Sequence, residues 1–148
     1  MFNLISSLYS FIIFLTRKSP MDSIVFYSEG NAYKPFLFPL MKEVGNKYNL
    51  PIFYLTSDQN DTVLSYRKIN FRSFYIGKGL ILTLTLYFLK TRILFMTMPD
   101  LNLFHIKKSI YPVHYSYLQH SLVSTHMVYR EGAFDHFDSI FCSGFHHL

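Results

Sequence analysis

Short runs rich in β-branched and aromatic residues alternate along this chain with longer segments of helical periodicity. Turn-forming residues bound the short runs, which have the length of strands. They fall at residues 24–27, 52–55, 71–76, 93–97, 113–118 and 139–142. Strand, helix, strand at this spacing predicts parallel pairs, because parallel neighbours need a long crossover connection. We therefore expect an α/β protein with one Rossmann-like parallel sheet flanked by helices.

The segments between these runs supply the helices. Residues 36–48 carry apolar side chains at helical spacing, and the preceding Pro35 suits a first helical turn. Residues 80–89 are expected to be helical, and residues 132–136 to form one helical turn. Half of the 148 residues are hydrophobic, which excludes a disordered chain and allows one packed domain.

The first twenty residues are expected to form an apolar leader, and residues 21–148 the folded lobe. Residues 2–15 are apolar and uncharged, and Arg17 and Lys18 follow directly. This run is shorter than the roughly 20 residues that span a bilayer. It also lacks the basic start and the cleavage site of a secretory signal. Two interpretations stay open: a helix in the interface of an anionic membrane, or a helix packed on the protein itself.

Charge narrows the class of partner. The net charge is +5, and only 16% of the residues are charged. A basic surface favours anionic partners such as phosphorylated substrates or acidic lipid. So few charges predict that a membrane, a partner or a further part of the protein covers some apolar surface. The basic residues are scattered, so no nucleic acid partner is expected. The single Cys142 excludes an intrachain disulfide and a thiolate zinc site, and we expect neither metal nor cofactor.

Polar residues follow three of the expected strands. In open α/β sheets ligands bind beyond the carboxyl ends of the strands. Residues 28–31, 97–100 and 119–121 occupy such ends and are expected to converge on one crevice. They bring the carboxylates of Glu29 and Asp100 and the imidazole of His120. Six of the seven histidines lie in the last 35 residues, and a surface or packing role is the alternative for each.

Histidine is the side chain that can take and give a proton near neutral pH. A neutral His120 could take the proton of an alcohol that attacks an activated phosphate, with a carboxylate orienting the ring. The hydroxyls of Ser121, Ser124 and Thr125 are candidate donors to such a substrate. Arg130 and the pair Lys107-Lys108 are candidate phosphate partners.

Other chemistries fit less well. Ser121 lacks the Gly-x-Ser-x-Gly turn of a hydrolase nucleophile. Zinc ligation by His120, His126 and His136 is disfavoured, because the six-residue spacing of the first two does not place them together on one helix face. Gly77-Lys78-Gly79 is not a dinucleotide fingerprint, and we interpret it as a tight strand-to-helix turn.

Five stretches carry a family resemblance: YSEGNAYKPFLFPL, FYLTSDQND, FYIGKG, TMPDLNLFHIKKS and QHSLVSTHMVYREGAFDHFDSIFCSGFHH. They resemble the CDP-glycerol glycerophosphotransferase family, in particular its bacterial surface-polymer enzymes, over about Ser23 to His147. The resemblance implies two Rossmann-like lobes of the GT-B type. It also implies transfer of glycerol phosphate from CDP-glycerol, or a similar nucleotide-activated donor, to a polyol-phosphate or glycan acceptor such as teichoic acid. Such an enzyme would lie peripherally on the cytoplasmic face of the bacterial inner membrane.

The family's N-terminal lobe carries a Trp-His-Gly motif whose histidine is the proposed base. Gln119-His120-Ser121 stands at that position, keeping the histidine and lacking the tryptophan and glycine. The resemblance implies that His120 is the base. Their places at strand ends or near His120 make the following residues the expected substrate-binding set: Glu29, Asp100, Ser121, Ser124, Thr125 and Arg130. The chain ends before the family's C-terminal, donor-binding lobe. It is therefore expected to be the N-terminal, acceptor-binding lobe, or alternatively a truncated non-catalytic remnant or interaction module that retains the fold.

Overall fold

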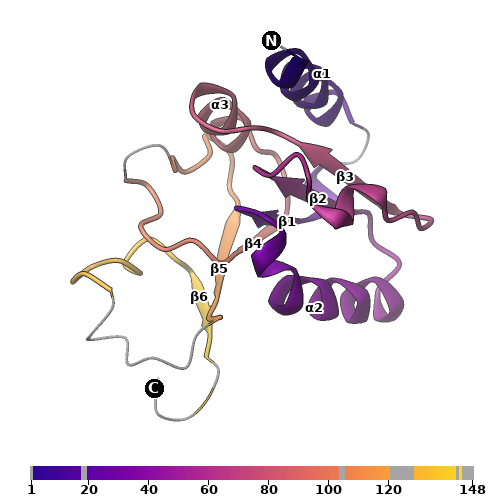
Figure 1. Ribbon diagram of the computed structural model, residues 1–148. Coiled ribbons are helices and arrows are strands. Elements are labelled where there is room, and N and C mark those ends of the chain that lie inside the picture. Colours follow the sequence, from indigo (N-terminus) through magenta and orange to yellow (C-terminus); the bar gives the residue numbers. More distant parts are fainter. Residues whose placement is uncertain (1, 18–19, 104–105, 121–128, 143, 145–148) are drawn as a thin grey trace.

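In the computed structural model, six parallel strands form one sheet with helices on both faces (Figure 1). The structure describes residues 2–17, 20–103, 106–120, 129–142 and 144. The strands are β1 (Ile24–Ser28), β2 (Ile52–Thr56), β3 (Phe71–Tyr75), β4 (Ile93–Met96), β5 (His114–Leu118) and β6 (Ser139–Phe141). Their order is β3-β2-β1-β4-β5-β6, and every pairing is parallel. The expected Rossmann-like α/β fold is confirmed, because this is the strand order of that fold.

The centre of the sheet is the most apolar part of the chain. All five residues of β1 and all five of β2 are buried, because both faces of these strands are covered. Ile24 pairs with Ile52 on one side and with Ile93 on the other, so the three central strands are in register at their amino ends. Their carboxyl ends consequently meet at one edge of the sheet.

Helix α2 (Lys34–Lys47) covers one face of the sheet (Figure 1). Pro35 lies in its first turn, where no N–H is needed. Leu37 and Met41 are buried on the inner side of the helix. The apolar cluster that they join also contains Ile24, Phe26, Ile52, Tyr54, Val63, Phe71 and Phe95.

The same face holds a buried polar network at the end of β2. The Asp61 carboxylate accepts hydrogen bonds from the Tyr54 hydroxyl (2.8 Å), the Thr56 hydroxyl (2.9 Å) and the Val63 N–H (2.9 Å). Asp61 thereby caps the short 3-10 helix η3 (Thr62–Ser65). The stretch TSDQND therefore forms turns and a cap, as its residue types predict.

Helices α1 (Phe2–Leu15) and α3 (Leu80–Tyr87) cover the opposite face (Figure 1). Phe14 of α1 is fully buried, and its ring meets the edges of Phe53 and Phe74 at centroid distances of 5.9 and 5.5 Å. The expected helix at residues 2–15 is confirmed, and it packs on the protein. Residues 131–136 form successive turns rather than one helical turn.

Candidate functional site

The chain changes direction between β1 and β4. After β1 it leads to α2 on one face of the sheet. After β4 it continues on the other face, where Leu101, Ile106 and Val113 pack in the cluster that contains α1 and α3. Neighbouring strands whose connections leave toward opposite faces open a crevice at their carboxyl ends, and ligands bind there in folds of this type.

A cavity of about 430 Å³ lies at this point. Its lining comes from β1, from α3 and from the segments that follow β1, β2, β3 and β4: Tyr27, Glu29, Ser57, Lys78, Gly79, Leu82, Met98, Pro99, Asp100, Leu103 and Ile106. Small-molecule sites have volumes of this order, with a mostly apolar wall and a few polar groups. The cavity is therefore large enough for a small substrate.

Three charged side chains stand in the lining: Glu29, Lys78 and Asp100. The Tyr27 hydroxyl lies 3.0 Å from the Ser57 hydroxyl at the inner wall. Burial raises the pKa of Tyr27, and the nearby Glu29 carboxylate adds to the rise, so this hydroxyl stays protonated. The cavity thus combines two carboxylates, one ammonium group and neutral hydroxyls.

Asp100 is held in place from two directions. Its backbone has a positive φ of 61°, and its N–H donates to the carbonyl of Ala133 at 2.9 Å. Its carboxylate accepts a hydrogen bond from Nε of Arg130 at 2.5 Å. Arg130, an expected phosphate partner, is therefore paired with Asp100. The pair ties the segment after β4 to the segment before β6.

His120 lies two residues beyond β5, at the same edge of the sheet. Its ring meets the rings of Tyr33 and Phe36 edge-on, at centroid distances of 5.1 and 5.7 Å. Its Nδ1 is buried and has no hydrogen-bond partner within the described part of the chain. Burial lowers the pKa of His120, against the opposing effects of the Glu29 carboxylate and the Leu118 main chain. The imidazole is consequently neutral at pH 7.

Glu29 is common to the cavity and to the surroundings of His120. Glu29 lines the cavity, and its negative charge favours a higher pKa for both His120 and the Tyr33 hydroxyl. Burial and this carboxylate raise the pKa of Tyr33. Nearby, the Tyr117 hydroxyl donates to the Tyr129 hydroxyl at 3.1 Å. Since His120 does not line the cavity itself, the site has two adjoining parts joined at Glu29.

The site residues expected from the sequence divide into three groups. Glu29 and Asp100 line one cavity, with Arg130 paired to Asp100 and His120 close to Glu29. Ser121, Ser124 and Thr125 lie outside the described residues, as does His126. Lys108 is engaged elsewhere: its ammonium donates to the His136 carbonyl at 3.1 Å and lies over the Tyr115 ring.

Lys78 is the site residue that the sequence analysis missed. The turn Gly77-Lys78-Gly79 does connect β3 to α3, and both glycines have a positive φ, 65° and 64°. That conformation is easy for glycine and places the lysine between them at the cavity. The signal in the sequence was a lysine inside a strand-to-helix turn, which by topology lies at the carboxyl edge.

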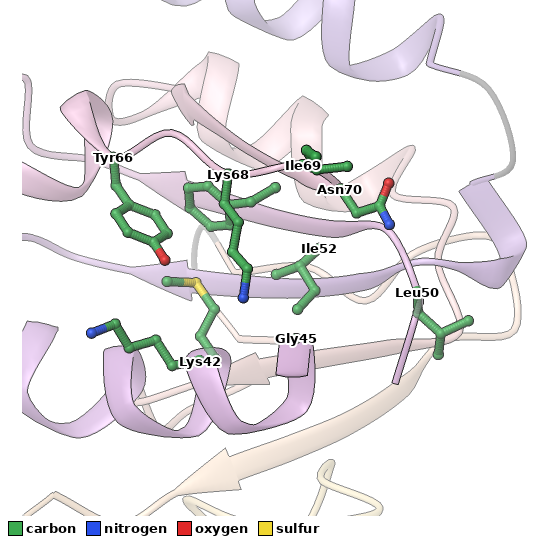
Figure 2. Close-up of a pocket in the computed structure, with 10 residues that line it drawn as sticks. Lys42, Gly45, Leu50, Ile52, Tyr66, Lys68, Ile69 and Asn70 are labelled. Carbon is green, nitrogen blue, oxygen red and sulfur yellow. The ribbon is translucent and has the colours of Figure 1, made fainter. Parts of the chain in front are cut away.

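A second hollow lies between α2 and the amino ends of β2 and β3 (Figure 2). Its volume of about 20 Å³ is enough for roughly one water molecule, so it is not a substrate site. Among the residues that the structure describes, no three His, Cys, Asp or Glu side chains are grouped to hold a metal ion.

Comparison with known proteins adds no relative. No protein-family model, no curated protein and no solved structure matches this chain. The assignment of function therefore depends on the geometry of the site and on the sequence motifs.

Proposed function

We propose that this chain is the acceptor-binding lobe of a membrane-associated transferase that moves glycerol phosphate from CDP-glycerol to a polymer hydroxyl. The observation that carries the proposal is His120, a neutral histidine beyond the carboxyl end of β5 and within electrostatic reach of Glu29. It adjoins a cavity of about 430 Å³ at the crossover between β1 and β4. The resemblance of the motifs around these residues to the CDP-glycerol glycerophosphotransferase family supplies the reaction.

His120 would act as the general base. An acceptor hydroxyl attacks the phosphorus that carries the glycerol, while an imidazole nitrogen of His120 takes the hydroxyl proton. The new bond joins the acceptor oxygen to phosphorus, and the bond that breaks releases CMP. The Glu29 carboxylate stabilises the imidazolium that forms, because an opposite charge nearby favours the charged state. The lowered pKa of His120 keeps the base free of its proton at pH 7.

The cavity would hold the end of the acceptor. A polyol phosphate offers hydroxyl donors, which suit the carboxylates of Glu29 and Asp100, and a phosphate, which suits the ammonium group of Lys78. A second nucleotide-binding lobe would hold the donor above the same edge of the sheet. The enzyme would act peripherally on the cytoplasmic face of the bacterial inner membrane, where a lipid-linked acceptor is found.

The role of His120 as the base can be tested by combining this chain with a donor-binding lobe. The measured quantity is the rate of glycerol phosphate transfer from CDP-glycerol to a lipid-linked acceptor. We expect His120→Ala to lower the rate roughly 10²- to 10⁴-fold, the usual contribution of a positioned base. His114→Ala is the matched control, since His114 lies at the opposite end of the same strand and contacts Ser139. Equal rates for the two variants would refute the assignment.

Binding of sn-glycerol 3-phosphate tests the cavity by itself. In an NMR titration of the 148-residue chain, we expect the largest shifts at the amides of Glu29, Lys78 and Asp100. Ile69, at the opposite edge in the small hollow, is the internal reference. Saturable shifts that Lys78→Gln weakens would support the acceptor site, and shifts of equal size at Ile69 would contradict it.

One observation favours the alternative, an interaction module that retains the fold without catalysis. The His120 ring packs on Tyr33 and Phe36 rather than in the wall of the cavity. A non-catalytic module would give no transfer from CDP-glycerol, with His120 or with His120→Gln, when it is combined with a donor-binding lobe. The same rate assay therefore separates the two functions.

A further inference from the structure

Helix α1 presents an apolar surface on the side that faces away from the sheet. Leu4, Ile5, Leu8, Tyr9 and Ile12 are each 48–66% exposed. The helix contains no charged residue. A helix with large apolar residues on both its inner and its outer side normally lies inside a protein or against a membrane. The outer side of α1 therefore requires a cover that the described chain does not supply.

A hollow of about 520 Å³ lies at the carboxyl end of α1. Its wall joins the end of the helix to the amino ends of β2 and β3: Ile13, Thr16, Arg17, Pro51, Phe53, Asn70 and Arg72. Two of these residues are arginines, and within the described lining none is acidic. The hollow thus has a positive charge without a carboxylate to balance it.

Arg17 is held rigidly in this wall. Its guanidinium donates to the carbonyl of Phe14 at 2.6 Å and to the carbonyl of Lys90, and it stacks on the Phe14 ring at 3.6 Å. Burial lowers the pKa of Arg17 to about 10, so the group is still charged at pH 7. Because main-chain carbonyls are neutral, this cation keeps its full charge toward the hollow.

Arg72 approaches from the edge strand β3. It pairs in register with Phe53, a residue of the face that α1 covers, and its side chain is exposed. Guanidinium groups bind phosphate oxygens through paired hydrogen bonds, and they do so better than a single ammonium group. The exposed Arg72 is therefore suited to a phosphate, and Arg17 adds a fixed positive charge beside it.

We propose that α1 lies in the interface of an anionic bilayer, with the phosphate of a lipid headgroup in the hollow formed by Thr16, Arg17 and Arg72. The apolar outer side of the helix would enter the boundary between headgroups and acyl chains, while its inner side stays packed on the sheet. No described helix is long and apolar enough to cross a bilayer. A net charge of +5 draws the chain to an anionic surface and repels a second copy of itself. The inference does not depend on the transferase reaction.

The burial of Phe14 determines which variants can test the membrane proposal. A chain that starts at Met21 would lack Phe14 and so would uncover Phe53 and Phe74 in the core. Point variants on the outer surface avoid this damage. Glutamine is the suitable replacement at Leu8 and Ile12, because its helix propensity is close to that of leucine. Arg72→Gln removes one charge at the hollow, and Lys47→Gln removes one charge from α2 on the opposite face.

Co-sedimentation of the intact chain with vesicles measures the effect. We expect binding to vesicles with 30% phosphatidylglycerol, a fraction chosen at roughly the level of acidic bacterial membranes, and little binding to pure phosphatidylcholine. Arg72→Gln should weaken binding about fivefold, because one basic residue near such a surface contributes about 1 kcal/mol. Lys47→Gln should change it less than about twofold. The double variant Leu8→Gln, Ile12→Gln should weaken it at least about tenfold, since burying one such side chain contributes about 1.5 kcal/mol or more.

Three results would overturn the proposal. Equal losses of vesicle binding for Arg72→Gln and Lys47→Gln would show that the chain is attracted by its net charge and not through the hollow. Self-association that the double variant abolishes, without any vesicle binding, would assign the outer side of α1 to a second copy. Soluble sn-glycerol 3-phosphate in millimolar excess should not release the chain from the vesicles. Release would mean that the hollow takes a free phosphate instead. Circular dichroism confirms that each variant is folded.

Discussion

Helices α1 and α2 both have 14 residues, and they cover opposite faces of the same sheet. Their inner sides are alike: Phe14 in α1 and Leu37 in α2 are fully buried. Their outer sides differ. Helix α2 ends in the exposed Lys47, whereas α1 turns Leu8 and Ile12 outward. The inner side of each helix stabilises the fold by packing on the sheet. The outer side indicates whether the helix faces solvent or another surface.

The first prediction tests whether the inner sides are equivalent. Phe14→Ala removes a buried ring that contacts Phe53 and Phe74, and we expect it to lower the free energy of unfolding by about 3–5 kcal/mol. Leu37→Ala, in α2, should cost about 2–5 kcal/mol. Denaturant unfolding measures both. A cost below about 1 kcal/mol for Phe14→Ala would show that α1 is a detachable leader, which would break the comparison.

The second prediction concerns the buried polar network around Asp61 on the α2 face. Asp61→Ala leaves the hydroxyls of Tyr54 and Thr56 buried without their acceptor, so we expect a loss of about 1–3 kcal/mol. Asp61→Asn keeps one acceptor oxygen and should lose less. The same unfolding assay compares them. Equal losses for the two variants would show that the cost comes from the cap on η3 and not from the hydroxyls.

The sequence predicted the fold closely because the signal was strong and local. Strands β1 and β2 are continuous apolar runs bounded by turn residues, as buried parallel strands are. The position of α1 was open, because an apolar run alone cannot distinguish an interfacial helix from a packed one. Phe14 shows that the inner side of α1 is packed, because its ring is fully buried against aromatic partners on β2 and β3.

The candidate site was predicted in part. Topology places residues that follow parallel strands at one edge, so Glu29, Asp100 and His120 could be expected near one another. Which of these residues share a cavity depends on the face of the sheet over which each strand connection passes. Hydrophobic periodicity in the sequence does not reveal that face. Lys78 was missed for this reason: the two flanking glycines indicated a turn, and its position relative to the β1–β4 crevice came only from the strand order.

The third prediction concerns His120, which packs against Tyr33 and Phe36 at the start of α2. Burial lowers its pKa, so we expect an NMR titration below the ordinary value of about 6.5. Between the two pKa values the unfolded chain binds more protons than the folded one. Stability therefore falls as the pH drops through this window. His120→Gln should remove that part of the acid dependence. A His120 pKa above about 6.5 would contradict the prediction.

The smallest effect is expected on the outer side of α1. Leu8→Gln removes an apolar side chain that is 48% exposed, and it keeps the helix propensity. We expect a change in the free energy of unfolding within about 0.5 kcal/mol, as for exposed positions in general. Met41→Gln, at a buried position of α2, should cost several times more. Urea unfolding of both variants sharpens the comparison: a substitution that leaves stability unchanged but weakens vesicle binding shows that the outer side of α1 serves the membrane alone. A loss above about 1 kcal/mol for Leu8→Gln would mean that this side packs within the protein, and α1 would then differ from α2 only in composition.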